Sequence, residues 1–440
     1  MSERGALRQN LPYLHGVYVA AAAISDARLV VDGPFCVVQK AEMHAAHDPG
    51  STLLVADGPG RLVPTDLQAK GPGVLNALRD REGPLVTLLA EVAALPATGV
   101  VLLAAMDIQE AAAAPLERYR RVATERGGAP IVLVDPRSLD GDWLDGFARS
   151  LDRLAERLPL PPAAPEPASV ALVGNFMDRR AGDQHGNLAE LGRLLEGIGV
   201  TTASTWLDGG PTASLQQAHR ASAVVSLPYA RAAARRLASR LGVPCVDAEL
   251  PLGVAATCRF LRTVADVTGR AAAADAFLAR EVDALVADVR PLAFRFLSGK
   301  TALLNADPHA GAALAELLAE LGVEVVGLTV TASPELLDPA VLERLAPLAP
   351  RYEPPLGPRS AAGQRDDAEA DADVLIASTL FPHDPRRATW LPFGYPNYLR
   401  HPTTLRPFLG FQGVRTWVDD LVEACLRADL RRRGRDEEDL

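Results

Sequence analysis

The stretch Leu188-Ala-Glu-Leu-Gly-Arg-Leu-Leu-Glu-Gly-Ile-Gly-Val200 shows how this 440-residue chain is built. Its leucines recur three and four residues apart, which predicts an amphipathic helix over Leu188–Glu196. Gly199 follows where a glycine cap is expected, and the β-branched Val200 comes directly after it to start a strand. The apolar run Val170–Val173 precedes the helix and predicts a buried strand. This order of strand, helix, glycine cap and strand is typical of a parallel α/β fold.

The same unit recurs along most of the chain. Helices predicted at Ala230–Leu241 and Ala310–Leu321 also end in a Gly-Val pair. Short apolar runs between helices predict strands of parallel sheets covered on both faces. These runs are Arg28–Val31, Val100–Leu103, Ile131–Val134, Val170–Val173, Ala223–Leu227, Ala302–Asn305, Val323–Leu328 and Val374–Ala377. At about 150 residues per domain, the length predicts an α/β protein of three doubly wound, parallel-sheet, Rossmann-like domains.

Two segments mark limits of these units. The proline-dense segment Pro159–Pro167 can form neither a helix nor a central strand, so the first domain is expected to end there. Near the end of the chain, a helix is expected over Trp417–Leu426. The charge run Arg431–Asp439 is expected to be a frayed, solvated end.

Composition excludes several classes of function. The chain has 45 Lys and Arg against 55 Asp and Glu, a net charge of -10, which argues against a general nucleic-acid binder. No segment reaches about 18 uninterrupted apolar residues, so we expect no membrane span and a cytoplasmic protein. Ser298-Gly299-Lys300-Thr301 lacks the earlier glycine of a phosphate-binding loop and is expected to be a turn before a strand. No dinucleotide fingerprint follows a strand either, so we expect no bound nucleotide.

The four cysteines are Cys36, Cys245, Cys258 and Cys425. They are far apart, which excludes a disulfide framework and any metal site made wholly by cysteines close in sequence. Cys245 is expected in a strand, and Cys258 and Cys425 in helices, where a buried structural role is the ordinary one.

Cys36 lies in the densest chemical cluster of the chain, which runs from Asp32 to Asp48 after a predicted strand. Sites in open α/β sheets gather at the carboxyl ends of strands. A helix over residues 36–47 would place Cys36, Lys40, His44 and His47 along one face. Such a stripe could serve a metal or a cluster. It could equally be a buried structural cysteine followed by an amphipathic helix.

Several stretches, taken in order, carry a resemblance to a known family. They are Gly174–Phe176, Gly182–Asp183, Leu188–Val200, Leu227, Ala233–Pro244, Pro251–Leu261, Gly299–Asp307, Leu314–Val323, Leu391–Pro396, Leu409–Gly413 and Leu421–Leu426. Their order and spacing resemble nitrogenase component 1 and its relatives, including the tetrapyrrole reductases that act on protochlorophyllide and chlorophyllide. The resemblance covers nearly the whole chain and is strongest from about residue 168. It implies domains at residues 1–165, 166–297 and 298–440.

The resemblance also implies an assembly and a cofactor. In this family two homologous subunits form a heterodimer, usually doubled to a heterotetramer, and an ATP-dependent iron–sulfur reductase supplies electrons. Cysteines of the first domains hold a cluster between the subunits. Cys36 matches the middle one of three such cysteines, whereas the other two positions fall at Asn10–Pro12 and Leu103–Asp107, which contain none. In some members of the family, one subunit gives three cysteines to the cluster and its partner gives a single ligand. The resemblance therefore implies that Cys36 is the one metal ligand that this chain gives to a shared iron–sulfur cluster, whose common form is [4Fe-4S].

The resemblance gives the leading hypothesis for function. The family's catalytic-cofactor cysteine and histidine fall at Leu227 and Leu409, so no molybdenum–iron cofactor is expected. We expect the β-type partner of an α-like subunit, passing low-potential electrons to a small-molecule substrate. Lys40, His44 and His47 are the candidate catalytic residues, as proton donors or as groups that tune the cluster. The alternatives are a non-catalytic scaffold for cofactor assembly, a degenerate structural partner, or a plain small-molecule-binding protein of the same fold.

Overall fold

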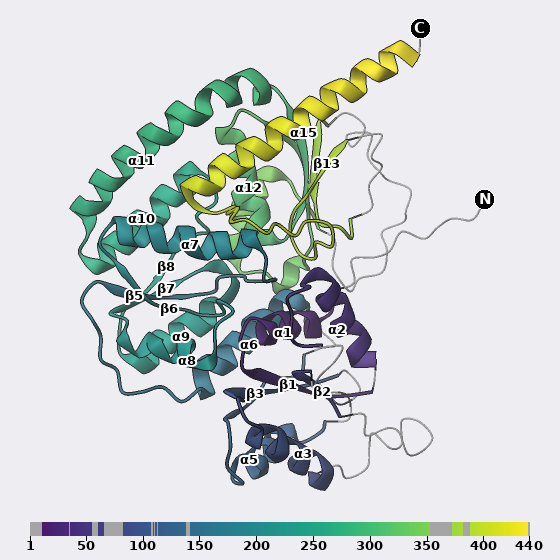
Figure 1. The fold of residues 1–440 in the computed structure, drawn as a ribbon, viewed down its shortest axis with the longest axis vertical. Coiled ribbons are helices and arrows are strands. Elements are labelled where there is room, and N and C mark those ends of the chain that lie inside the picture. The colour runs from purple at the N-terminus through teal and green to yellow at the C-terminus, as the bar shows by residue number, and fades with distance from the viewer. Residues whose placement is uncertain are drawn as a thin grey trace.

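Three parallel sheets make up the chain (Figure 1). The computed structural model describes residues 11–34, 36–54, 60–65, 82–106, 109, 111, 113–137, 141–352, 372–381 and 388–438. Within each sheet, every neighbouring pair of strands is parallel. Helices connect the strands and cover the sheets, as right-handed parallel connections require. The predicted α/β fold with three doubly wound parallel sheets is confirmed.

The first sheet has four strands in the spatial order β2 (Leu62–Pro64), β1 (Ala27–Asp32), β3 (Val100–Ala105) and β4 (Ile131–Leu133). In the part of the chain that the structure describes, its helices are α1 (Tyr13–Ala22), α2 (Cys36–His47), α3 (Glu82–Ala94), α5 (Leu116–Thr124) and α6 (Trp143–Arg157). Alternate residues of β1 enter two different cores: Leu29 and Val31 pack with α1 and α6, and Val30 packs with α3 and α5. This alternation explains why the strand reads as a continuous apolar run.

The second sheet has the order β6 (Thr201–Thr205), β5 (Ser169–Val173), β7 (Ala223–Ser226) and β8 (Cys245–Asp247). Its helices are α7 (Gly182–Gly197), α8 (Thr212–Gln216), α9 (Arg231–Leu241), α10 (Val254–Thr268) and α11 (Ala271–Leu292). Short helical turns lie at Gln217–Arg220, Pro228–Ala230 and Ala293–Leu297. The segment before β5 has no helix or strand between residues 159 and 167, as its prolines predict.

The third sheet has five strands in the order β11 (Arg351–Tyr352), β10 (Glu324–Val330), β9 (Thr301–Ala306), β12 (Val374–Ala377) and β13 (Thr389–Pro392). Its helices are α12 (Pro308–Glu320), α13 (Pro339–Leu345) and α15 (Gly410–Glu438), with short turns at Pro334–Leu336 and Ala346–Leu348. Ser298 and Gly299 form a turn before β9, as predicted, and the Lys300 amine bonds Asp429 of α15 at 2.6 Å. Because α15 continues to Glu438, the prediction of a frayed end was wrong for Arg431–Glu438, and Asp439 lies outside the described residues.

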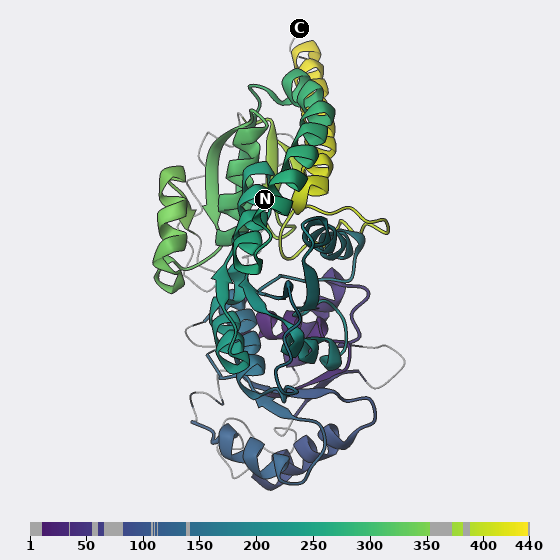
Figure 2. The same cartoon turned by 90° about the vertical axis from the view of Figure 1, so that its left-hand side faces the viewer.

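Neighbouring sheets share their cores. One core joins β1 and β3 to β5 and β7 through α1, α6 and α9, and it contains Trp143 and Phe147. A second core joins the other face of the second sheet to β9 and β12, with α10, α12 and α15 around it. The elements of the three sheets therefore lie against one another along the long axis of the molecule (Figure 2). No helix in the described part of the chain is both long and apolar enough to cross a membrane.

Candidate functional site

Each sheet has one place where the direction of winding reverses. In the first sheet the reversal lies between β1 and β3, in the second between β5 and β7, and in the third between β9 and β12. The loops that leave such a pair of strands go to opposite sides of the sheet and leave a crevice at the carboxyl ends, where ligands of open α/β sheets bind. These three reversal points locate the candidate site.

At the first reversal point, two sulfur atoms lie together. β1 ends at Asp32, and α2 begins at Cys36; β3 ends at Ala105, and Met106 follows. The Cys36 Sγ lies 3.8 Å from the Met106 Sδ, and both side chains are half-buried. The Met106 N–H donates to the Asp32 carbonyl at 3.0 Å, which continues the pairing of the two strands beyond their ends. The predicted candidate Cys36 thus lies at a sheet crevice, at the partially positive N-terminal end of a helix.

Helix α2 has the predicted bounds, but its four predicted site residues divide into two environments. Cys36 and Lys40 are half-buried, whereas His44 and His47 are buried. Neither ring nitrogen of His44 has a hydrogen-bond partner among the described residues. Burial, together with the charges of His47 and His15, lowers the pKa of His44 to about 3, so its imidazole is neutral at pH 7.

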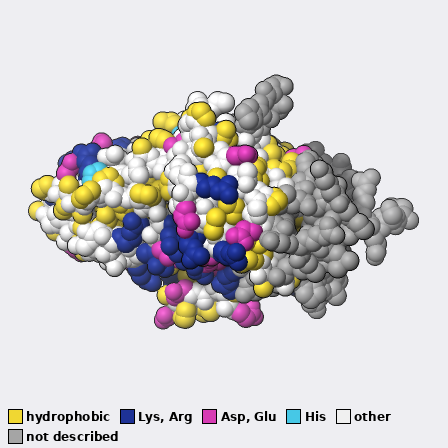
Figure 3. Space-filling view, turned by 90° about the horizontal axis from the view of Figure 1, so that it is seen from below, with side chains coloured by type: hydrophobic (Ala, Val, Ile, Leu, Met, Phe, Trp, Pro, Cys, Tyr) yellow, Lys and Arg dark blue, Asp and Glu magenta, His cyan; other side chains and the backbone are white. Residues whose placement is uncertain are grey.

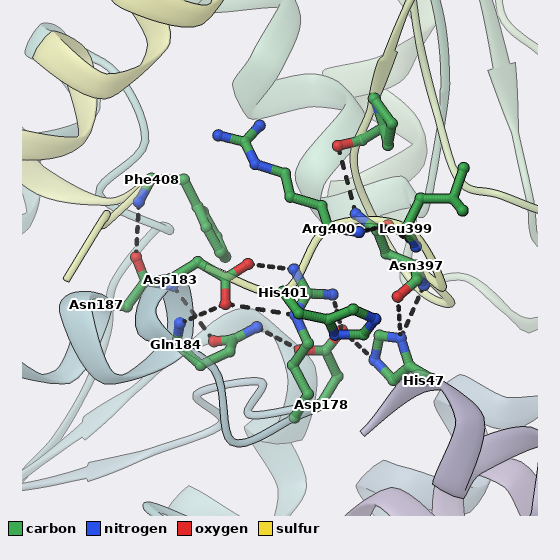
Figure 4. Close-up of polar contacts among 12 residues, drawn as sticks. His47, Asp178, Asp183, Gln184, Asn187, Asn397, Leu399, Arg400, His401 and Phe408 are labelled. Carbon is green, nitrogen blue, oxygen red and sulfur yellow. Dashed lines mark hydrogen bonds and ion pairs between the residues drawn. The ribbon is translucent and has the colours of Figure 1, made fainter. Parts of the chain in front are cut away.

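His47 connects all three sheets. Its Nε2 lies 2.9 Å from the Asp178 Oδ2, in the segment after β5, and its Nδ1 lies 2.8 Å from the backbone nitrogen of Asn397, after β13 (Figure 4). The Asn397 carbonyl oxygen lies 3.0 Å from the same Nδ1, so this nitrogen can accept from the Asn397 N–H or donate to the carbonyl, and Nε2–H can donate to Asp178. The Tyr395 ring packs edge-on against the imidazole at 4.9 Å. The structure therefore places this predicted candidate in a buried contact between segments that are remote in sequence.

Asp178 lies at the centre of this contact. Burial raises its pKa, but Arg179 and His47 outweigh burial and lower the pKa of Asp178 to about 2. Gln184 donates a hydrogen bond to its other oxygen, and Arg179 in turn pairs with Asp183. The carboxylate is thus ionised at every pH at which the protein would function. Sequence reasoning missed Asp178, which lies in none of the predicted elements.

The closing segment near Leu409 is held by α7. The Asn187 Oδ1 accepts hydrogen bonds from the backbone N–H groups of Phe408 and Leu409, at 2.9 and 3.1 Å. Gly410 has φ +70°, and a Cβ there would lie 2.4 Å from the Cγ of Glu190. Only glycine fits this position, because it tolerates the backbone conformation and leaves room for the carboxylate.

A small pocket lies at the third reversal point. It is partly open and has a volume of about 10 Å³, which is room for about one water molecule. Its walls come from the first and third sheets: Leu11, Trp143, Asn305, Ala306, Asp307, Thr331, Ser378, Gly394 and Tyr395. The Trp143 Nε1 is buried and has no hydrogen-bond partner in the described part of the chain. A ligand with a hydrogen-bond acceptor would satisfy this group.

An acid–hydroxyl pair adjoins the pocket. The Tyr229 hydroxyl, from the loop after β7, lies 3.1 and 3.0 Å from the two oxygens of Asp307, after β9. Burial raises the pKa of Asp307, and burial with the charge of Asp307 raises the pKa of Tyr229 well above its usual value. Asp307 also caps α12 through the N–H groups of His309 and Ala310. Such a pair can hold a proton beside a bound molecule.

Comparison with known proteins establishes the family. A sequence model of the nitrogenase component 1 type oxidoreductases matches residues 13–426. The chain belongs to this family. No curated protein matches it in sequence closely enough to count as a relative.

Two solved structures show the same fold as this nitrogenase component 1 family member. One, described as "Nitrogenase Cp1 at pH 6.5", has a TM-score of 0.76 and 17% identity, and the match covers 97% of this chain and 95% of that one. Another, "Nitrogenase Cp1 at pH 5", has a TM-score of 0.66 and 16% identity, and the match covers 96% and 90%. At such identities the likeness concerns the fold, and residue roles have to come from this chain's own site.

The family binds iron–sulfur clusters. No group of three or more His, Cys, Asp or Glu in the described residues has the arrangement of a metal site. Cys36 is the one cysteine at a sheet crevice, since Cys245 lies in β8, Cys258 in α10 and Cys425 in α15, as predicted. Among the described residues, one cysteine therefore lies at the end of a central strand, whereas a cubane needs about four ligands.

Proposed function

We propose that this chain is the β-type subunit of a nitrogenase-like, ATP-dependent reductase complex and holds an iron–sulfur cluster jointly with a homologous α-like subunit. The observation that carries the proposal is the position of Cys36, half-buried at the crevice between β1 and β3 and at the start of α2. The partner would provide the remaining ligands of a [4Fe-4S] cluster. When bound, the cluster would take up and release single low-potential electrons.

The polar residues of α2 would serve this cluster in different ways. Lys40 is one helical turn from Cys36, where its ammonium group can offset the negative charge of thiolate ligands. His44 is neutral at pH 7 and resists taking up a second proton, so its part would be that of a neutral imidazole whose nitrogens have no hydrogen-bond partner among the described residues. His47 orients Asp178 and Asn397, so its part in proton movement would depend on this network. We propose Lys40, His44 and His47 as the catalytic candidates, acting on the charge around the cluster or on protons near it.

The pocket at the third sheet is the proposed place for a small-molecule substrate. Trp143 can donate one hydrogen bond into it, and the Tyr229–Asp307 pair can hold a proton beside it. In this conformation the pocket has room for about one water-sized group, so a substrate would place a small polar group in it and a whole tetrapyrrole would not enter.

The proposed partners follow from this assignment. They are the α-like subunit, an ATP-dependent iron–sulfur reductase and a small molecule, in a cytoplasmic heterotetramer. We propose no nucleic-acid partner: Lys and Arg side chains gather on one face, but Asp and Glu side chains lie among them (Figure 3), and the net charge is -10.

Anaerobic purification from the native host, with whatever subunit accompanies the tagged chain, tests the proposal. Iron and acid-labile sulfide are measured for wild type, Cys36→Ala and the control Cys258→Ala, whose cysteine lies in α10. We expect Cys36→Ala to lose most of the iron and Cys258→Ala to keep it. Equal iron in all three proteins would refute the role of Cys36.

A second candidate function is a scaffold on which a cluster is assembled and then passed on. The cysteine-free positions at Leu11–Pro12 and Leu103–Met106 favour it, because few ligands in this chain make a cluster easier to release. Mixing the iron-loaded complex with an apo acceptor protein distinguishes the two. A scaffold loses iron to the acceptor, whereas a reductase subunit keeps its iron and becomes reduced when the reductase and ATP are added.

A further inference from the structure

The four tryptophans of the chain differ in what their indole nitrogens bond. Trp206, Trp390 and Trp417 each donate from Nε1 to a backbone carbonyl, at 3.2, 3.2 and 3.3 Å. Trp143 is 1% exposed, and its Nε1 has no hydrogen-bond partner among the described residues. Buried donors without an acceptor are rare in folded proteins. The Trp143 indole is therefore the one whose donor is available to a bound molecule.

The Trp143 indole is held in place at the wall of the pocket at the third reversal point. Asp142 caps the start of α6, and the Trp143 N–H donates to the Leu11 carbonyl at 3.2 Å. The indole packs against the rings of Tyr395 and Phe176, with centroids 5.1 Å away in both cases. A donor fixed in this way by a helix start and by packed rings suits a preorganised binding site.

The size and charge of the pocket limit what can accept from this donor. The pocket has room for about one water-sized group. The described residues that line it include Asp307 but no Lys, Arg or His, so a carboxylate or phosphate would meet no offsetting cation there. We propose that the Trp143 Nε1–H binds an uncharged oxygen of the substrate, from a carbonyl or a hydroxyl group. This inference rests on the proposed function, since it assumes that the pocket receives part of the substrate.

Asp307 favours an uncharged group over an ion of either sign. Burial raises the pKa of Asp307, while hydrogen bonds from the Tyr229 hydroxyl and from the backbone of His309 and Ala310 oppose that rise. An anion would be repelled whenever Asp307 is ionised. His309 adds no positive charge at pH 7, because burial lowers its pKa to about 3. An ammonium group would be attracted to Asp307, but it has no lone pair to accept from the indole N–H.

Nuclear magnetic resonance of the full chain, isotopically labelled at its tryptophan indole nitrogens, tests the inference. Trp143→Phe removes one of the four indole N–H signals and so identifies that of Trp143. Formamide offers an uncharged carbonyl oxygen, methanol offers a hydroxyl, and formate is an anion of nearly the size of formamide. We expect formamide or methanol to shift the Trp143 signal with saturation while the other three signals stay in place. The probe that shifts it at the lower concentration distinguishes a carbonyl from a hydroxyl group. Formate should leave the signal unchanged.

Asp307→Asn is the matched variant for the charge argument, since asparagine can also cap α12. In this variant we expect formate to shift the Trp143 signal. A Trp143 signal that neither formamide nor methanol shifts, or that formate shifts equally in the wild type, would overturn the inference. If Trp143→Phe does not fold, Trp206→Phe, Trp390→Phe and Trp417→Phe assign the other three signals and leave that of Trp143.

The readout is independent of iron, so the two proposals can fail separately. Iron retained by Cys36→Ala would overturn the proposed function, whatever the probes do to the Trp143 signal. A Trp143 signal that the uncharged probes do not move, together with iron lost from Cys36→Ala, would overturn only the inference about the pocket.

Discussion

Replacing His47 by leucine should destabilise the protein strongly, whereas the same change at His44 should not. Both imidazoles are buried on one helix, but their hydrogen bonds differ. His47 bonds Asp178 at 2.9 Å and the Asn397 N–H at 2.8 Å, while His44 has no partner among the described residues. Leaving a buried group without its hydrogen-bond partner costs about 1–3 kcal/mol, and more when that group is charged, as the Asp178 carboxylate is. We expect about 3 kcal/mol for His47→Leu, because Asp178 keeps Arg179 and Gln184.

For His44→Leu the expected change is within about 1 kcal/mol and in the stabilising direction, because an apolar side chain replaces an unsatisfied polar one. Urea unfolding of the wild type and the two variants, followed by tryptophan fluorescence, measures the difference. Trp143 is a suitable probe because its indole lies 5.1 Å from the Tyr395 ring, which packs against His47. Equal losses in the two variants, or a larger loss for His44→Leu, would refute the assignment of His47 as the interdomain contact.

Two further predictions concern pH and backbone conformation. The folded chain resists protonating His44, whose pKa is lowered to about 3, while the unfolded chain protonates it below its usual 6.5. The free energy of unfolding should therefore fall as pH drops from 6.5 towards 3, by up to about 1.4 kcal/mol per pH unit from this group. In urea unfolding measured across this pH range, the free energy of unfolding of His44→Leu should fall less steeply than that of the wild type. Gly410→Ala should destabilise by about 2 kcal/mol or more, because φ is +70° and the Cβ meets Glu190. Gly192→Ala in α7, where a Cβ meets nothing within 4 Å, should instead stabilise by about 0.5–1 kcal/mol in the same assay.

The sequence allowed the fold to be predicted wherever strands are apolar on both faces. Apolar runs in the sequence predicted the central strands β1, β3, β5, β7, β9 and β12. Helix α2 has the predicted range of residues 36–47. A strand starting at Val200 was predicted, but the range of the edge strand β6, Thr201–Thr205, was not, because it is polar and mostly half-exposed. The edge strand β2 has three residues, too few for a periodic pattern to show.

The candidate site could be predicted in part. Cys36 was accessible to sequence reasoning because it follows an apolar strand directly. Its neighbour Met106 is 70 residues away and could not be paired with it before the adjacency of β1 and β3 was known. The same holds for His47, whose partners are 131 and 350 residues distant. A signal for Asp307 did exist, since Asn305 and Asp307 come at the end of a predicted strand, where ligands of such sheets bind.

The most direct test of the central claim is the electron paramagnetic resonance spectrum of the reduced complex with Cys36→Ser. A serine oxygen in place of the Cys36 sulfur would change the electronic structure of the iron that it binds, and so the g-values of the cluster. The account predicts altered g-values for Cys36→Ser and an unchanged spectrum for Cys258→Ser. A spectrum from Cys36→Ser that is identical to the wild type, at equal iron content, would contradict the claim that this chain holds a shared cluster through Cys36.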